Sequence, residues 1–308
     1  MTSPDPTVLA LPRMLRPRDT LAVVAPASPF DRESFQNGVQ VLGDMGFRLH
    51  IPEEIFAASG YLAGGDHHRA GLIKRLFVDP SIAGIVCARG GYGAMRILPL
   101  LNADAISRHP KVFVGFSDIT VLLSFLVSRC QMVAFHGPTV TTLGRGDGAT
   151  GRGFLSALAD PTPLAMVASP AHVIQAGAAV GPFWCGNLTL WCHLTGTAFQ
   201  PDWRGGIVLI EDQGEAPYRI DRMLTHMRLA GCFDKLAGLA LGTFSNCGGM
   251  NTIRRIVADR LGGLDIPILG GFAVGHGDVN LTLPMGLPVQ LDTATGTLKF
   301  TQSALSPI

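Results

Sequence analysis

Residues 111–126, KVFVGFSDITVLLSFL, join two different apolar patterns. The first part is almost continuously apolar, as in a strand buried in a parallel sheet, whereas the second has helical spacing. Ser117 and Asp118 lie at the junction, which puts the Ser117 hydroxyl at an expected helix N-terminus, where unpaired N–H groups suit a developing oxyanion. Gly115 matches the G-x-S-x-G nucleophile turn, but Ile119 replaces its second glycine. A plain helix N-cap is therefore the alternative interpretation.

The surrounding residues 20–140 alternate strand and helix patterns in the same way. Strands are predicted within 20–28, 48–55, 82–93, 111–116 and 132–138, and helices within 31–47 and 67–79. Apolar strands separated by helices predict an α/β fold, with a mainly parallel sheet covered by helices on both faces. The strand-to-helix loops of such a sheet lie along one edge, where these folds build their sites.

The later part of the chain has a different organisation. Residues 146–180 are partly glycine-rich and show no sustained period, which indicates a linker between an N-terminal domain (14–145) and a C-terminal domain (181–308). The second domain is predicted to be α/β with a β-rich finish. Its strands are expected within 206–211, 236–244 and 266–277, its helices within 218–231 and 251–263, and its closing hairpin within 287–300.

Composition excludes several classes of function. The chain has 308 residues, 47% hydrophobic and 15% charged, with a net charge of +1, so no general attraction to nucleic acid or acidic lipid is expected. No stretch approaches the about 18 apolar residues of a membrane-spanning helix, and the N-terminus lacks the apolar core of a signal peptide. Six cysteines without a C-x-x-C pair predict reduced thiols in a cytoplasmic protein.

Two further strand ends carry groups with possible chemistry. Glu211 directly follows an apolar run and is a sheltered carboxylate able to orient an imidazole, although it could be a solvated loop acid. His276 is flanked by glycines and could act as acid and base, or be merely structural. The glycine turn in residues 88–96, ARGGYGAMR, could cradle a phosphate, supply an oxyanion donor or be a simple turn. Ser117, Glu211 and His276 follow one another in the chain in the order nucleophile, acid, histidine, as in α/β-hydrolases. No metal-binding motif is present in the sequence.

Six motifs carry a resemblance to a known family: RGGYGAMRILPLL, PKVFVGFSDIT, FHGPTV, CGNLTL, LIEDQGEAPYRIDRML and GHGDVNLTLPMG. Together, from about residue 15 to 300, they resemble the LD-carboxypeptidase serine peptidases. The resemblance implies a catalytic triad of Ser117, Glu211 and His276, with the backbone N–H groups of Asp118 and Gly91 as oxyanion hole. It also implies a homodimer without metal or cofactor, which releases terminal D-alanine from murein tetrapeptide in the cytoplasm.

The substrate-binding candidates are Arg89, Tyr92 and Asn187. Arg89 precedes the glycine turn, and its guanidinium could hold the free carboxylate of a carboxypeptidase substrate. Cys185 departs from the family, which commonly has glycine at this position of the Gly-Gly-Asn-Leu loop. The larger side chain puts the shape of the substrate pocket in doubt.

Two alternatives to this function remain open. One is the microcin-immunity branch of the same family, which cleaves an amide joining an amino acid to a nucleotide-like group, with Trp184 and Trp191 as a possible aromatic platform. The other is a non-catalytic α/β protein that binds a small molecule, in which Ser117 only caps a helix.

Overall fold

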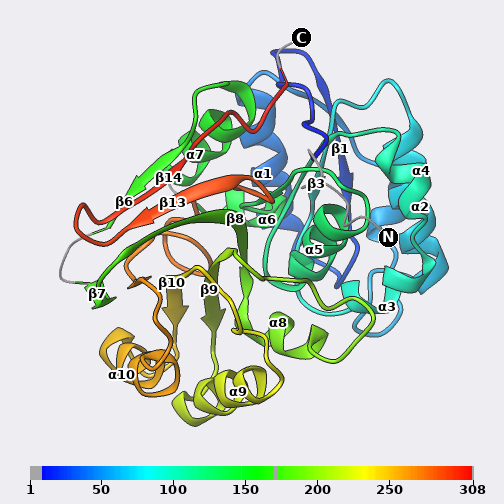
Figure 1. Ribbon diagram of the computed structural model, residues 1–308. Helices are drawn as coiled ribbons and strands as arrows, with labels where there is room; N and C mark the ends of the chain where they lie inside the picture. The colour runs from blue at the N-terminus through cyan, green and yellow to red at the C-terminus, as the bar shows by residue number, and fades with distance from the viewer. Residues whose placement is uncertain (1–8, 147, 169–171, 307–308) are drawn as a thin grey trace, which may run out of the picture.

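The computed structural model describes residues 9–146, 148–168 and 172–306 and contains two sheets (Figure 1). The first has six strands in the order β12-β5-β4-β3-β1-β2. Five of them run parallel, and β12, from near the end of the chain, pairs antiparallel with β5. The strands are β1 (Thr20–Val24), β2 (Arg48–His50), β3 (Gly84–Cys87), β4 (Val112–Gly115), β5 (Ala134–His136) and β12 (Leu283–Met285).

Helices cover both faces of this sheet, which confirms the fold class expected for the first part of the chain. In Figure 1, α1 and α6 lie together on one side of the strands, and α2 and α4 lie on the other. The helices are α1 (Arg32–Asp44), α2 (Asp66–Val78), α3 (Ala94–Ile97), α4 (Ala103–Ser107), α5 (Thr120–Ser128) and α6 (Val140–Leu143), with short 3₁₀ turns η1 (Glu53–Phe56), η2 (Leu98–Leu100) and η3 (Ser117–Ile119).

The second sheet has eight strands in the order β6-β14-β13-β8-β9-β10-β11-β7. Its central strands β8 to β11 are parallel, and the hairpin β13–β14 provides the expected β-rich finish. The strands are β6 (Ala165–Val167), β7 (Val173–Gln175), β8 (Ala178–Asn187), β9 (Ile207–Gln213), β10 (Gly238–Ser245), β11 (Ile268–Leu269), β13 (Pro288–Asp292) and β14 (Thr297–Phe300). The helices are α8 (Leu188–Leu194), α9 (Pro217–Leu229) and α10 (Met250–Leu261).

The stretch 146–180, expected to link two domains, contains regular structure among its described residues. Helix α7 (Gly148–Ala159) buries Phe154 and Leu158 completely, and β6 and β7 form the two ends of the eight-stranded sheet. The sequence shows no hydrophobic period here because α7, β6 and β7 depend on contacts with distant segments; β6, for example, pairs with β14. The division into domains stays a prediction.

A close contact next to the expected nucleophile joins β8 of the second sheet to α5, which packs against β4 and β5 of the first sheet. A Cβ on Gly186 of β8 would lie 2.3 Å from Thr120 Cγ2, in the first turn of α5, so only glycine allows this approach. The next backbone N–H, of Asn187, donates a hydrogen bond of 3.0 Å to Thr120 Oγ1. The carboxyl end of β8 is thus fixed beside the Ser117 turn. No helix in the described ranges is long and apolar enough to cross a membrane.

Candidate active site

Ser117 occupies a strained turn between β4 and α5. Its φ of 64° lies in the left-handed region, which costs a non-glycine residue about 1–3 kcal/mol and is typical of functional turns. Phe116 is the N-cap residue of η3, and the Ser117 side chain makes no hydrogen bond within the described part of the chain, so it does not act as a cap. A Cβ on Gly115 would meet Ile119 Cγ2 at 2.7 Å, which explains why a glycine precedes this turn.

Glu211 and His276 form a hydrogen-bonded pair at the carboxyl end of the second sheet. Glu211 follows the apolar residues of β9 and is completely buried, and His276 Nδ1 lies 2.6 Å from its Oε2. An ionised carboxylate only accepts hydrogen bonds, so Nδ1 carries the proton and Nε2 is left free to accept one. The backbone N–H of His276 donates to the same oxygen at 3.2 Å. A Cβ on Gly275 would lie 2.3 Å from that oxygen, so the glycine before His276 is required.

The charge state of His276 follows from its surroundings. Burial lowers its pKa, but the hydrogen bond with Glu211 and the negative charges of Glu211 and Asp212 raise it more, and the net shift is upward. Only 15% of the His276 side chain is exposed. An imidazolium formed at this position is therefore stabilised, as a general base requires.

Asn187 supports the Glu211 carboxylate from the opposite side. Its Nδ2 donates to Glu211 Oε1 at 3.3 Å and to Asp212 Oδ1 at 3.0 Å, while its Oδ1 accepts from Leu190 N at 3.2 Å and caps α8. Asn187 is buried, 4% exposed. Thr189 holds Asp212 in turn, through its N–H and its hydroxyl. These contacts favour a role for Asn187 in positioning Glu211 over the substrate contact expected from the sequence.

The glycine turn lies directly against Ser117. A Cβ on Gly90 would lie 2.9 Å from Ser117 Cβ and 3.2 Å from its Oγ. Among the described residues, neither the Gly91 N–H nor the Asp118 N–H has a hydrogen-bond acceptor, so both are free to bind an oxyanion. The Asp118 carboxylate accepts from Ala94 N at 2.7 Å and so ties the glycine turn to the Ser117 turn. Burial raises the pKa of this carboxyl to about 6.

Ser117 and His276 line the same cavity, of about 390 Å³. A second cavity of about 440 Å³ shares five of its lining residues, and we call the two together the cleft. The shared residues are Phe116, Thr142, Arg145, Gln213 and His276. The Phe116 and His276 rings lie 4.8 Å apart between centroids. Among the described residues, no hydrogen bond joins Ser117 Oγ to the His276 ring; catalytic hydrogen bonds of this kind often tighten only in the complex with substrate.

The remaining substrate candidates differ in position. Arg89 lines the first cavity, and its Nη1 donates to Pro29 O at 2.8 Å. Tyr92 is 53% exposed and packs against Tyr61, outside the residues that line the cleft. Cys185 is completely buried and does not line the cleft either, so its thiol leaves the cavity shape unaffected.

Sequence reasoning missed three charged or amide side chains of the cleft, those of Arg145, Gln213 and Asp278. Arg145 and Asp278 lie in loops and Gln213 is the last residue of β9, at the same edge as the predicted catalytic residues, and Asp278 is two residues after His276. Charged or amide side chains in loops and at strand ends along that edge were the available signal. Arg145 was overlooked because it lies at the start of a glycine-rich stretch that shows no period.

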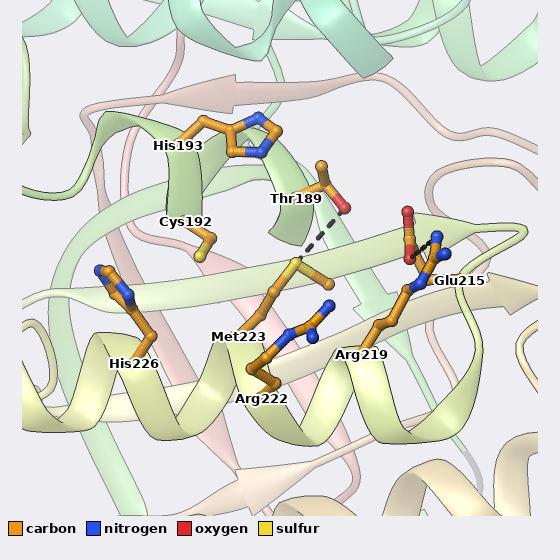
Figure 2. Close-up of a pocket in the computed structure, with 8 residues that line it drawn as sticks. All are labelled: Thr189, Cys192, His193, Glu215, Arg219, Arg222, Met223 and His226. Atoms are coloured by element: carbon orange, nitrogen blue, oxygen red, sulfur yellow. Dashed lines mark hydrogen bonds and ion pairs between the residues drawn. The ribbon is translucent and has the colours of Figure 1, made fainter.

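A separate cavity lies between α8 and α9 (Figure 2), and we call it the α8–α9 pocket. It has a volume of about 340 Å³ and is lined by Thr189, Cys192, His193, Glu215, Arg219, Arg222, Met223 and His226. Arg219 reaches Glu215 at 3.5 Å. The pocket contains neither a residue on a strained turn nor a glycine turn. Across the described residues, no group of three or more histidines, cysteines or acids is arranged to hold a metal ion.

The tryptophans expected as an aromatic platform are buried in the core. Trp191 stacks edge-on between Trp184 and Trp203, at centroid distances of 6.4 and 5.2 Å. Trp184 and Trp191 are 7% and 1% exposed, and neither lines the cleft. They cannot stack on a substrate in this conformation.

Comparisons with known proteins cover both sheets. The model of the LD-carboxypeptidase N-terminal domain matches residues 21–137, and that of the LD-carboxypeptidase C-terminal domain matches residues 180–291. A putative carboxypeptidase from Synechocystis sp. is 39% identical, over 94% of this chain and 96% of that protein. A probable murein peptide carboxypeptidase from Bacillus subtilis is 32% identical, over 93% and 92% respectively.

Solved structures of related proteins have a similar fold over most of the chain. The Escherichia coli microcin C7 self-immunity protein MccF matches with a TM-score of 0.88 and 25% identity, over 96% of this chain and all (100%) of that one. A muramoyltetrapeptide carboxypeptidase from Oxalobacter formigenes matches with a TM-score of 0.81 and 28% identity, over 91% and 97%. The resemblance found in the sequence is confirmed, and the chain belongs to the LD-carboxypeptidase family.

Proposed function

We propose that this protein is a cytoplasmic serine LD-carboxypeptidase, which releases the terminal D-alanine from murein tetrapeptide during cell-wall recycling. The observation that carries the proposal is the cleft, in which Ser117 on its strained turn faces the same cavity as the Glu211–His276 pair. The names of relatives, a murein peptide carboxypeptidase and a muramoyltetrapeptide carboxypeptidase, support the substrate class.

The chemistry assigns a role to each of the three residues. His276 Nε2 takes the proton of Ser117 Oγ as this oxygen attacks the carbonyl carbon of the scissile amide. Glu211 keeps the imidazole in the required tautomer and stabilises the imidazolium. The negative charge that develops on the carbonyl oxygen is bound by the N–H groups of Gly91 and Asp118, which have no acceptor among the described residues.

Collapse of this intermediate breaks the amide bond. The proton on His276 moves to the leaving amine, D-alanine departs, and an acyl-enzyme on Ser117 remains. Water then repeats the same steps, with His276 as base, and releases the shortened peptide. Arg89 beside the glycine turn is suited to bind the free carboxylate of the leaving residue, because a guanidinium binds a carboxylate with two hydrogen bonds.

Mass analysis of murein tetrapeptide incubated with the protein tests the proposal. Wild type is expected to release one D-alanine, whereas Ser117→Ala loses roughly 10⁴- to 10⁶-fold in kcat. A serine-reactive phosphonate should label wild type at Ser117 and leave the variant unlabelled. Activity that survives in Ser117→Ala, without label on wild type, would mean that another group is the nucleophile. A wild type that releases no D-alanine and takes no label would favour a binding protein.

The microcin-immunity type of reaction is the second candidate, because the fold is close to MccF. The buried positions of Trp184 and Trp191 remove the aromatic platform that favoured it. Side-by-side hydrolysis of murein tetrapeptide and an aminoacyl sulfamoyl adenylate separates the two, and a preference for the adenylate would reverse the order of the candidates.

A homodimer is also part of the proposal, on family resemblance alone. Sedimentation equilibrium measures it directly, with twice the chain mass of 32.6 kDa as the expected result. A sedimentation mass equal to one chain at micromolar concentration would contradict it.

A further inference from the structure

The second cavity of the cleft carries both signs of charge. Arg145 and Asp278 line it, together with the Phe116 ring and the backbone around Gly275. Asp278 is exposed, and its carboxylate has no hydrogen-bond or ion-pair partner within the described ranges. A cation and an unpaired anion on the wall of one cavity of about 440 Å³ suit a ligand group that is itself zwitterionic.

Arg145 is held in place from behind. Its Nε donates to Ser34 Oγ at 2.7 Å, and its Nη2 lies 3.9 Å from Oδ2 of Asp31, the N-cap residue of α1. These contacts use one edge of the guanidinium. The remaining N–H groups can still donate two parallel hydrogen bonds to a carboxylate in the cleft.

The first cavity contains Arg89 in addition to Arg145, and no acid among its described lining residues. Arg89 adjoins the glycine turn, whereas Arg145 lines both cavities. The carboxylate of a terminal D-alanine needs only one of the two guanidinium groups. The second arginine therefore indicates a second carboxylate, on the part of the substrate that extends into the cavity of Asp278.

Murein peptides carry a diamino acid before the scissile bond, and its side chain ends either in an ammonium group alone or in an ammonium and a carboxylate. Resting on the proposed function, we infer that Arg145 and Asp278 bind the zwitterionic end of a diaminodicarboxylic acid at this position. Arg145 binds the carboxylate, Asp278 accepts from the ammonium group, and the Phe116 ring covers the methylene groups between that end and the acyl carbon on Ser117. The enzyme then prefers diaminopimelate to lysine.

Three tetrapeptides that differ only in the third residue test this inference. They contain diaminopimelate, diaminopimelate amidated at its side-chain carboxyl, and lysine. Wild type is expected to cleave the first with the highest kcat/KM. Arg145→Gln lowers kcat/KM for that peptide by about 10- to 100-fold, the loss of hydrogen bonds to a charged group, and leaves the other two nearly unchanged. Arg145→Lys gives an intermediate value, since the charge remains without the planar fork.

Two further variants separate the roles of the charged residues. Arg89→Gln is expected to lower kcat/KM for all three peptides alike, because all end in the same carboxylate. Asp278→Asn also lowers it for all three, but not for a lysine peptide acetylated on its side-chain amine. Arg204→Gln is the matched control, because Arg204 is exposed, ion-paired with Asp202 and outside the cleft.

The possible outcomes are distinct. Equal kcat/KM of wild type for the three peptides, or an equal loss on all three in Arg145→Gln, overturns the inference and leaves the carboxypeptidase proposal intact. A wild type that cleaves none of them, while a different amide is hydrolysed through Ser117, overturns the proposed function and the inference with it. Melting curves of each variant show whether a loss comes from unfolding.

Discussion

Two sites in the described part of the molecule contain both arginine and histidine side chains, the cleft and the α8–α9 pocket. The pocket has the larger number of these side chains, with Arg219, Arg222, His193 and His226 on its wall (Figure 2). The cleft has fewer, but it contains a strained turn, a buried acid bonded to an imidazole, and free backbone N–H groups. Charged side chains on a surface are common, whereas strain and a buried ion pair persist only where the fold enforces them. Substitutions in the cleft and in the pocket test whether the cleft is catalytic and the charged side chains of the pocket are merely solvated.

After Ser117→Ala, the largest effect is expected for Glu211→Gln. The glutamine amide can donate to His276 Nδ1 and so favours the tautomer with its proton on Nε2, which cannot accept the Ser117 proton. We expect kcat to fall by roughly 10³- to 10⁴-fold with little change in KM. Steady-state kinetics on murein tetrapeptide measure this.

Glu33→Gln is the control, since Glu33 is an exposed acid in the first turn of α1. Its kcat should equal that of wild type. A Glu211→Gln enzyme that retains most of its kcat would show that the acid is structural, and the contrast between the two cavities would lose its main support.

Much of the cleft was predictable because it lies at the ends of elements with clear periodicity. The switch from strand to helix pattern located Ser117, and the apolar run before Glu211 predicted its burial, which the structure confirms. A glycine precedes His276 because a Cβ at this position would lie 2.3 Å from Glu211 Oε2. The catalytic roles of these three residues stay predictions, although their positions favour them.

The parts that could not be predicted depend on contacts between distant segments. Asn187 was expected to contact substrate, but its amide bonds Glu211 because β8 and β9 lie side by side. Arg145 belongs to the cleft because Ser34, more than 100 positions earlier in the chain (a separation of 111), holds its guanidinium. Local periodicity carries no information on such pairs.

The second prediction concerns the contact that joins the two sheets. Gly186→Ala places a Cβ where Thr120 Cγ2 would be 2.3 Å away, and overpacking of this kind costs about 1–3 kcal/mol. We expect the free energy of unfolding to fall by that amount in denaturant titrations, with a loss of activity because β8 moves away from the Ser117 turn.

Two variants control for other causes. Gly43→Ala, in α1 with nothing within 4 Å of the added Cβ, should be neutral or stabilising. Thr120→Ser combined with Gly186→Ala removes the closest methyl group and should recover part of the stability. Equal stability of Gly186→Ala and wild type would mean that the sheets are not held together at this point.

The third prediction is the pH dependence of kcat/KM. His276 must be neutral to accept a proton, and its pKa is raised, so activity should fall on the acid side with a midpoint above that of an ordinary imidazole. Asp118 has a pKa of about 6 and titrates in the same range. Asp118→Asn keeps an acceptor for Ala94 N and should leave the acid limb in place. A limb that disappears in this variant would belong to Asp118 and not to His276.

The smallest effect is expected for Arg222→Gln in the α8–α9 pocket. Arg222 is exposed, and its guanidinium lies over the Tyr218 ring, 5.6 Å from the ring centroid. Surface changes of this kind alter stability by no more than about 0.5 kcal/mol, so kcat/KM should stay within about twofold of wild type. The same substitution at Arg145, in the cleft, is the matched comparison, measured on the diaminopimelate peptide. If Arg222→Gln loses as much as Arg145→Gln, the pocket contributes to substrate binding, because a purely solvated arginine has no means of changing the rate at Ser117.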